Sequence, residues 1–222
     1  MAGTGTGGDC ILGAARWTPP SLPPDLTVLR TPALFLLTFR APMHVHAAIL
    51  LRKIRLTESS LIVSWLTEEQ GRIKTVAKGA LRPKSRLGGV LDLFHLCEIQ
   101  VQPARSGDLH SLREVSLLES FAGIRTDFAR ISLAAYAVEL IEGATEPETP
   151  VPELYDLLAR LLRHLHQMPA SQRGLLHFES ELARLLGVTS PQHTAEYALQ
   201  RHLQRLPAAR RDLFARLPPK PA

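Results

Sequence analysis

The 222 residues of this chain suffice for one large domain or two small ones, and either arrangement could bury a core. A formal net charge of +5 and a pI near 9.6 suit a nucleic acid or another anionic partner. The two cysteines exclude a disulfide framework and a four-cysteine metal site, and no stretch reaches the ~20 apolar residues of a membrane helix. We therefore expect a cytoplasmic protein without a membrane partner.

Residues 1–43 differ in composition from the rest of the chain. Gly and Thr cluster at residues 3–8, and prolines recur from Pro19 to Pro42. Such a segment is not expected to pack as a regular element, so we expect a disordered extension. One interpretation is that translation starts at Met43. Detection of a natural peptide spanning residues 30–40 would contradict that interpretation.

Residues 44–120 show the alternation and the turn residues of short β-strands. Five strands are predicted, at residues 47–56, 60–67, 71–78, 93–102 and 109–118. Turn residues at 58–60, 69–71 and 106–108 separate most of them, whereas the third and fourth strands are joined by a long connection. Five short strands with one long connection favour a closed Greek-key barrel of the OB type.

Beyond the fifth strand the apolar period changes to that of helices. Helices are predicted at residues 121–141, 154–168, 172–186, 194–206 and 208–217. Ser171 is expected to cap the third helix, and Gly143 is expected to end the first. The predicted fold class is therefore α+β, with an OB-type barrel at residues 44–120 followed by an α-helical domain at residues 121–222.

The segment from Leu66 to Leu91 has the most informative charge pattern. Between Glu69 and Asp92 it contains no acidic residue but six basic ones: Arg72, Lys74, Lys78, Arg82, Lys84 and Arg86. Its first half is predicted to be a half-buried strand and its second half a loop. A strand that leads into a basic loop could hold phosphates, although a solvated charged face is the competing interpretation.

Basic residues on the first predicted strand could complete a positive groove. Arg52, Lys53 and Arg55 lie there, and a barrel would bring the first and third strands near one another. Aromatic residues are scarce in this half, so phosphate contacts would dominate over base stacking. Trp65 suits the core as well as a stacking platform. If six phosphates were neutralised on a single strand, the slope of log affinity against log salt would be about −4.

The sequence contains no motif that predicts catalysis, a metal site or a cofactor. The glycines of residues 3–8 match a dinucleotide-binding fingerprint, but no strand precedes them and no helix follows. The histidine pair at residues 44–46 lacks a third metal ligand, and the pair at residues 164–166 would point to different faces of a helix. Cys97 suits a buried position in a strand. We therefore predict no catalytic residue, no bound metal and no cofactor.

An ordered series of short motifs runs through residues 45–120. They are Ala48-Ile49-Leu50-Leu51-Arg52, Glu58-Ser59-Ser60, Leu66-Thr67, Gly71-Arg72, Ala77-Lys78-Gly79-Ala80, Pro83-Lys84-Ser85, and Leu109 with Leu112-Arg113-Glu114. This series resembles the N-terminal half of the bacterial RecO family of recombination mediators. The resemblance continues more loosely through the helices to Leu186-Gly187.

The resemblance implies an OB fold, a helical C-terminal domain and no covalent chemistry. It also implies a protein at the nucleoid that binds single- and double-stranded DNA, anneals complementary strands and works with RecR, single-stranded DNA-binding protein and, indirectly, RecA. The predicted DNA-binding residues are Arg52, Lys53, Arg72, Lys74, Lys78, Arg82, Lys84 and Arg86. The alternative is a protein-interaction module whose helical domain bridges repair partners with little direct DNA binding.

Two features depart from the family pattern. Many members carry a four-cysteine zinc site after the position of Gly187, whereas residues 188–222 contain no cysteine. Zinc is therefore not predicted, and contacts that the zinc region would make are in doubt. The second departure is the extension that precedes Met43.

Overall fold

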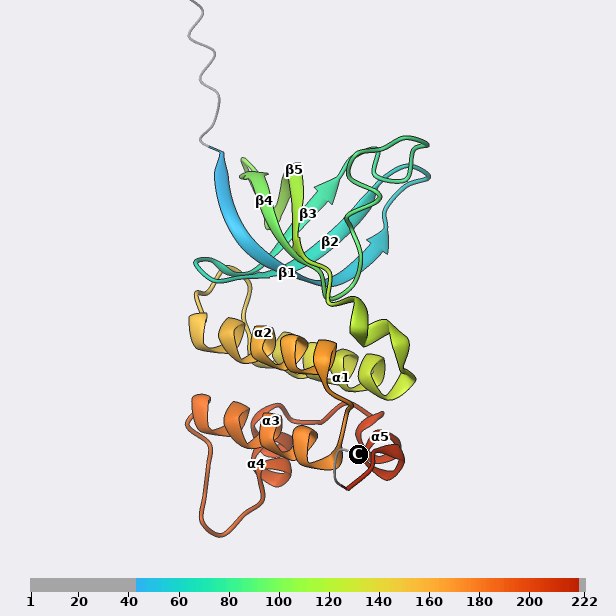
Figure 1. The fold of residues 1–222 in the computed structure, drawn as a ribbon. Helices are drawn as coiled ribbons and strands as arrows, with labels where there is room; N and C mark the ends of the chain where they lie inside the picture. Colours follow the sequence, from blue (N-terminus) through green and yellow to red (C-terminus); the bar gives the residue numbers. More distant parts are fainter. Residues whose placement is uncertain (1–42, 220–222) are drawn as a thin grey trace, which may run out of the picture. The chain divides into compact units, whose positions relative to one another are not determined.

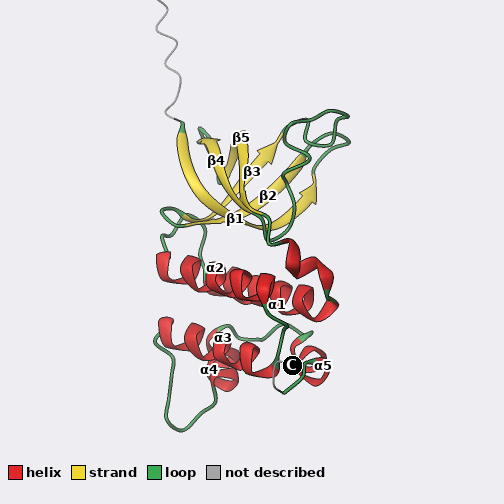
Figure 2. Ribbon diagram, viewed as in Figure 1, coloured by secondary structure: helices red, strands yellow, loops and turns green. Residues whose placement is uncertain are grey.

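The structure is a computed structural model, and it describes residues 43–219. Within this range five β-strands are followed by a short 3-10 helix and five α-helices (Figures 1 and 2). The extension predicted at residues 1–43 lies outside the described residues, apart from Met43 itself. None of the helices between residues 43 and 219 combines the length and the apolarity that crossing a membrane requires.

The five strands close into a barrel. They are β1 (His44–Arg55), β2 (Leu61–Thr67), β3 (Gly71–Ala77), β4 (Leu96–Gln102) and β5 (Leu109–Glu119). Their order around the barrel is β1-β2-β3-β5-β4, and every neighbouring pair is antiparallel except β3 with β5. All five predicted strands are confirmed, as is the α+β fold class with a barrel before the helices.

β1 contributes one face to the barrel core and the other face to the core that the helices build. Its first half pairs with β4 and its second half pairs with β2, and the register shifts between Leu50 and Arg52, which bends the strand. Ala48 and Leu50 pack inside the barrel, whereas Ile49 and Leu51 belong to the core that the helices build. Both faces of the central part of β1 are therefore buried.

Trp65 and Cys97 both lie in the barrel interior, which settles their roles. Trp65 is fully buried, and its indole Nε1 donates a hydrogen bond to Thr75 Oγ1 at 2.8 Å. It is therefore a core residue and not a stacking platform. Burial raises the pKa of the Cys97 thiol to about 12, in agreement with the predicted buried position in a strand.

The helices pack against the outside of β1 and against one another. They are α1 (Phe128–Ala144), α2 (Pro152–Gln167), α3 (Gln172–Leu185), α4 (Ala195–His202) and α5 (Arg210–Arg216). α1 and α2 lie next to the barrel, and α3 to α5 lie on their far side (Figure 1). One continuous hydrophobic core runs from the outer face of the barrel through these two layers. Whether the chain divides into two domains at residue 120 stays a prediction.

The start and the end of the first helix differ from the prediction. A separate 3-10 helix, η1 (Ala122–Thr126), precedes α1, and Asp127 caps α1 by accepting a hydrogen bond from Ala129 N at 3.0 Å. Gly143 does not end the helix, because Ala144 continues it. At the third helix, Ser171 is the N-cap as predicted and accepts from Gly174 N at 3.1 Å.

The connection between α1 and α2 is bonded to the edge of β3. Glu148 N donates to Arg72 O at 2.9 Å, and Arg72 and Pro147 pair as an isolated parallel β-bridge. Gly71 beside it has a φ of +66°, and a Cβ at this position would lie 1.8 Å from the carbonyl oxygen of Thr149. Only glycine fits this close approach. Backbone contacts therefore join the helices to the barrel in addition to the shared core.

Candidate nucleic-acid interface

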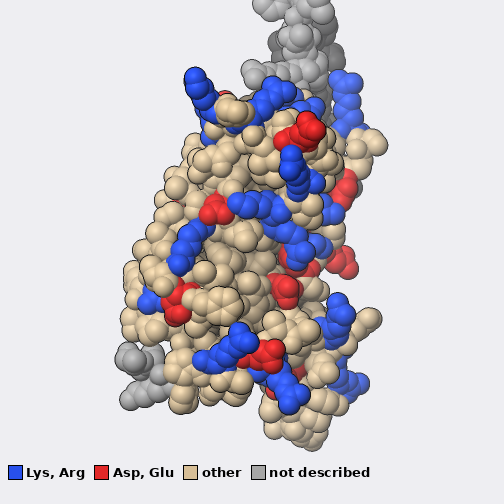
Figure 3. All heavy atoms as spheres, turned by 90° about the vertical axis from the view of Figure 1, so that its right-hand side faces the viewer, with Lys and Arg blue, Asp and Glu red and all other residues tan. Residues whose placement is uncertain are grey.

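Four of the eight predicted DNA-binding residues lie on the connection between β3 and β4, at residues 78–90, which we call the basic loop. They are Lys78, Arg82, Lys84 and Arg86. All four are exposed, and none of them forms an ion pair with any residue between 43 and 219. Basic side chains gather over the barrel end of the face shown in Figure 3. The basic loop thus presents cations whose charge no neighbouring carboxylate neutralises.

The basic loop is anchored although it has no helix or strand of its own. Ala80 inside it and Leu91 just after it are buried in the barrel core, and Leu87 and Val90 pack against that core. Leu81 N donates to Ser59 O in the β1–β2 turn. Because the backbone is held in place, less conformational entropy is lost when a ligand binds to the cations.

Arg52 and Lys74 are engaged within the protein. Arg52 Nη2 lies 2.6 Å from Glu142 Oε2 on α1, and this contact raises the pKa of Arg52. Lys74 Nζ lies 3.3 Å from Asp108 Oδ2 in the β4–β5 turn, and the hydrogen bond lowers the pKa of Asp108. A phosphate would have to compete with these carboxylates. The two residues therefore differ from the cations of the basic loop.

Arg72 faces the helices instead of the basic loop. Its side chain is half-buried, and Nη2 donates to Thr145 O at 3.0 Å. Arg72 lies at the start of β3, beside the helices, whereas Lys78 follows the end of β3 and belongs to the basic loop. The structure does not bring all six cations of the charge run together on one surface.

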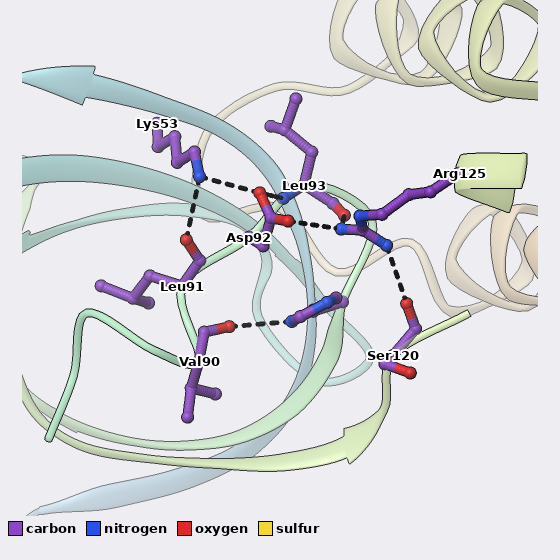
Figure 4. A network of polar contacts seen from close by, with 8 residues as sticks. Lys53, Val90, Leu91, Asp92, Leu93, Ser120 and Arg125 are labelled. Carbon is purple, nitrogen blue, oxygen red and sulfur yellow. Dashed lines mark hydrogen bonds and ion pairs between the residues drawn. The ribbon is translucent and has the colours of Figure 1, made fainter. Parts of the chain in front are cut away.

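Lys53 belongs to a polar network around Asp92, which lies just after the basic loop (Figure 4). Lys53 Nζ donates to Asp92 Oδ1 at 2.8 Å and to Leu91 O at 3.1 Å. From η1, Arg125 Nη2 donates to Asp92 Oδ2 at 2.7 Å and to Leu93 O at 3.0 Å. Partial burial raises the pKa of Asp92, but the hydrogen bonds from Lys53 and Arg125 outweigh it and lower the pKa to about 2. Asp92 therefore ties β1, the basic loop and η1 together.

We expect Asp92→Asn to remove an acid-sensitive part of the stability. The pKa of Asp92 is about 2 in the folded protein, against a usual value of 3.8. Its contacts therefore stabilise the fold fully above the usual value and are lost as the pH falls towards 2. Because the side chain is 45% exposed, solvent screening reduces this contribution to about 1 kcal/mol. Urea unfolding should show the variant to be less stable at neutral pH and equal to wild type below the folded pKa, whereas an equal gap at both would contradict the assignment.

The sequence did not predict a groove between α2 and α3, which we call the α2–α3 groove. Its volume is about 530 Å³, and its apolar lining comes from Leu157, Leu161 and Phe178. The basic side chains that line it are Arg160, His164, Arg173 and His177. The one acidic lining residue, Glu181, is paired with Arg184 at 2.9 Å. The alternation of Leu157, Arg160, Leu161 and His164 along one helix face is the signal that could have indicated it.

The histidine pairs have contacts of their own. The rings of His44 and His46 are stacked with centroids 6.0 Å apart, and His166 Nδ1 accepts a hydrogen bond from Gly123 N at 2.9 Å. Among residues 43–219 there is no group of three His, Cys, Asp or Glu side chains arranged to hold a metal ion.

Comparison with known proteins identifies the family. The family model "Recombination protein O N terminal" matches residues 43–121, and "Recombination protein O C terminal" matches residues 125–193. The DNA repair protein RecO of Pelobacter propionicus is 38% identical over 130 residues, which are 59% of this chain and 52% of that protein. The RecO proteins of Anaeromyxobacter dehalogenans strain 2CP-C and Salinibacter ruber are both 34% identical, over 63% and 64% of this chain and 55% of each relative.

The matches cover the barrel and the first helices in order. The chain spans about half the length of the curated relatives it matches. The N-terminal model ends where η1 begins, and the C-terminal model ends before α4. This chain belongs to the RecO family of DNA repair proteins.

Proposed function

We propose that this protein is a non-enzymatic DNA-binding mediator of recombination. It anneals complementary strands, helps load a recombinase onto protein-coated single-stranded DNA, and works at the nucleoid without a cofactor. The observation that carries the proposal is the basic loop, with four exposed cations that no carboxylate of the described residues neutralises. The names of its relatives, which are DNA repair proteins, support the same conclusion.

The chemistry of the basic loop suits phosphates. An exposed Lys or Arg that binds a DNA phosphate releases condensed counterions, so each contact adds affinity that falls as salt rises. Such contacts carry no sequence information, because the phosphate backbone is the same at every step. We therefore expect binding that depends weakly on sequence and strongly on salt.

The eight predicted residues take two roles in this proposal. Lys78, Arg82, Lys84 and Arg86 contact phosphates directly. The other four, Arg52, Lys53, Arg72 and Lys74, hold the barrel, the loop and the helices together and add to the positive field. With four contacts in place of six, the slope of log affinity against log salt on single-stranded DNA becomes about −3.

Two assays of the purified full chain test the proposal. Fluorescence anisotropy with labelled single-stranded DNA at several salt concentrations should give the slope of about −3. A second assay should show annealing of complementary oligonucleotides without nucleotide or metal. An affinity that does not change with salt, or annealing no faster than in protein-free solution, would overturn it.

A second candidate function is the protein-interaction module, and the α2–α3 groove favours it. An apolar floor with basic side chains around it complements an acidic segment that carries apolar side chains. Candidate partners are RecR and single-stranded DNA-binding protein, with RecA engaged indirectly. Capture of such a partner by a protein that no longer binds DNA at physiological salt would favour this function. Loss of capture in Arg160→Glu/Arg173→Glu would place the partner in the groove.

A further inference from the structure

Three large aliphatic side chains are exposed at the end of the barrel that carries the basic loop. Ile54 near the end of β1 is 53% exposed, Leu56 in the β1–β2 turn is 46% exposed, and Leu81 in the basic loop is 44% exposed. Leu81 N donates to Ser59 O at 3.0 Å, so the turn and the loop lie side by side. We call Ile54, Leu56 and Leu81 the apolar tip.

The surroundings of the apolar tip are strongly basic. Residues 54–60 and 78–90 contain five basic residues, which are Arg55 and the four cations of the basic loop, and a single acidic residue, Glu58. Arg55 donates to the carbonyl oxygens of Thr57 and Glu58, which holds the β1–β2 turn in shape. A single exposed leucine is ordinary on a protein surface, but here exposed aliphatic groups share one end of the barrel with cations that form no ion pair within residues 43–219.

This combination selects for a ligand that is anionic and apolar at once. A duplex presents phosphates but keeps the faces of its bases stacked inside, whereas a single strand can turn unstacked base faces towards a protein. Trp65 and Phe94, the only Phe, Tyr or Trp residues between 44 and 120, are buried, so their rings are not available for stacking on bases. Aliphatic side chains can cover a base face in their place, as apolar wedges do between base steps.

We infer that the apolar tip contacts the faces of unstacked bases while the basic loop holds the phosphates, so that this site prefers single-stranded DNA to duplex. The inference rests on the proposed function, because it concerns the same DNA-binding surface. It adds a contact to the bases themselves, which phosphate binding alone does not require.

The test compares DNA with and without bases. The probes are a labelled single-stranded oligonucleotide and an oligonucleotide of equal length in which abasic sites replace the central bases, both measured by anisotropy with the full chain. Wild type should bind the abasic probe about fivefold more weakly, because phosphates remain and base faces are lost. Leu56→Ser/Leu81→Ser should lose about the same factor on the normal probe and nothing on the abasic probe.

A matched control separates the apolar tip from general loss of exposed aliphatic surface. Leu118 on β5 is 53% exposed and lies outside the tip, so Leu118→Ser should leave both affinities unchanged. Thermal unfolding checks that all variants are folded. Because the three substituted leucines are exposed, their melting temperatures should stay close to that of wild type.

Each remaining outcome overturns the inference. Equal binding of the two probes by wild type, together with the expected salt dependence, would leave the proposed function intact and remove the base contact. An equal loss on both probes in the double variant would show that the leucines shape the loop and do not touch bases. If the double variant kept its DNA affinity but no longer sedimented with phosphatidylglycerol vesicles that wild type binds, the tip would belong to a membrane surface. If wild type bound neither probe, the proposed function would fail and the inference with it.

Discussion

Replacing Arg210 by alanine should lower the free energy of unfolding by about 3–5 kcal/mol. The carboxylate of Glu179 on α3 is completely buried, and Arg210 on α5 is its ion-pair partner. Arg210 Nε lies 2.6 Å from Glu179 Oε1, and Nη2 lies 2.8 Å from Oε2. This paired geometry satisfies both carboxylate oxygens at once. Without the guanidinium, a buried negative charge is left with no compensating cation.

The remaining partners of Glu179 cannot replace Arg210. Tyr136 OH donates to Glu179 Oε1 at 2.5 Å, and burial together with this carboxylate raises the pKa of Tyr136. A neutral hydroxyl contributes one hydrogen bond but no charge. Arg210 also lies 2.7 Å from Glu196 of α4, and its guanidinium sits over the Phe214 ring at 5.8 Å. Its loss would therefore loosen α3, α4 and α5 together.

Chemical denaturation of three variants measures this effect. Arg184→Ala breaks the exposed pair with Glu181 on the same helix and should leave the free energy of unfolding close to that of wild type. Glu179→Gln combined with Arg210→Ala should recover much of the loss, because the uncompensated charge is gone. A loss below about 1 kcal/mol in Arg210→Ala, or a double variant less stable than the single one, would contradict the buried-charge explanation.

The barrel could be predicted because its signals are local. Along β3 the side chains alternate between buried and half-buried, and the polar and apolar residues from Arg72 to Lys74 show that alternation in the sequence. Five such runs with turn residues between them leave few topologies for a small sheet. The missed helix start has a local signal too, since Asp127 before the apolar period is an N-cap residue. The φ of 46° at Phe121, which precedes η1, is a tertiary feature that no sequence pattern reveals.

The sequence could not show which predicted cations are paired within the protein and which are available to DNA, because the pairing partners lie far away in the sequence. Lys74 and Lys78 look alike in the charge run, but Asp108 lies within reach of Lys74 only. Arg52 meets Glu142 ninety positions later, when α1 packs on β1. A charge run gives the number of cations and their spacing. Which of them remain available to a ligand follows from the folded structure.

The same argument applies to Glu179. In the sequence it is one more charged residue in a helix, and a charged helix position is ordinarily solvated. Its partner, Arg210, lies on a helix beyond the end of the C-terminal family match. α5 therefore depends on an ion pair to a residue inside the matched region. Leu199, Leu213 and Leu217 of this segment belong to the same hydrophobic core as α1 to α3, and the Arg210–Glu179 pair joins α5 to α3 in addition.

Replacing Lys78, Arg82, Lys84 and Arg86 together by alanine should abolish most of the salt-dependent binding to single-stranded DNA. Each phosphate contact on a single strand contributes about 0.7 to the slope of log affinity against log salt, so the slope should fall in magnitude by about 3. The four residues are exposed and form no ion pair within residues 43–219, so the free energy of unfolding should change by less than about 0.5 kcal/mol for each. Anisotropy titrations across a salt series, with unfolding curves for both proteins, measure the two quantities.

A control with the same change in net charge decides whether the site or the total charge matters. Arg201, Arg205, Arg211 and Arg216 are also exposed cations without an ion pair among the described residues, but they lie on α4, α5 and the segment between them. Replacing these four by alanine lowers the net charge by the same amount, so the long-range attraction that depends on net charge falls equally in both variants. If the basic loop makes the phosphate contacts, the control keeps the wild-type slope and loses only a little affinity. If the slope of log affinity against log salt falls equally in both variants, the phosphate contacts are spread over the whole surface. The basic loop is then a charged face like any other.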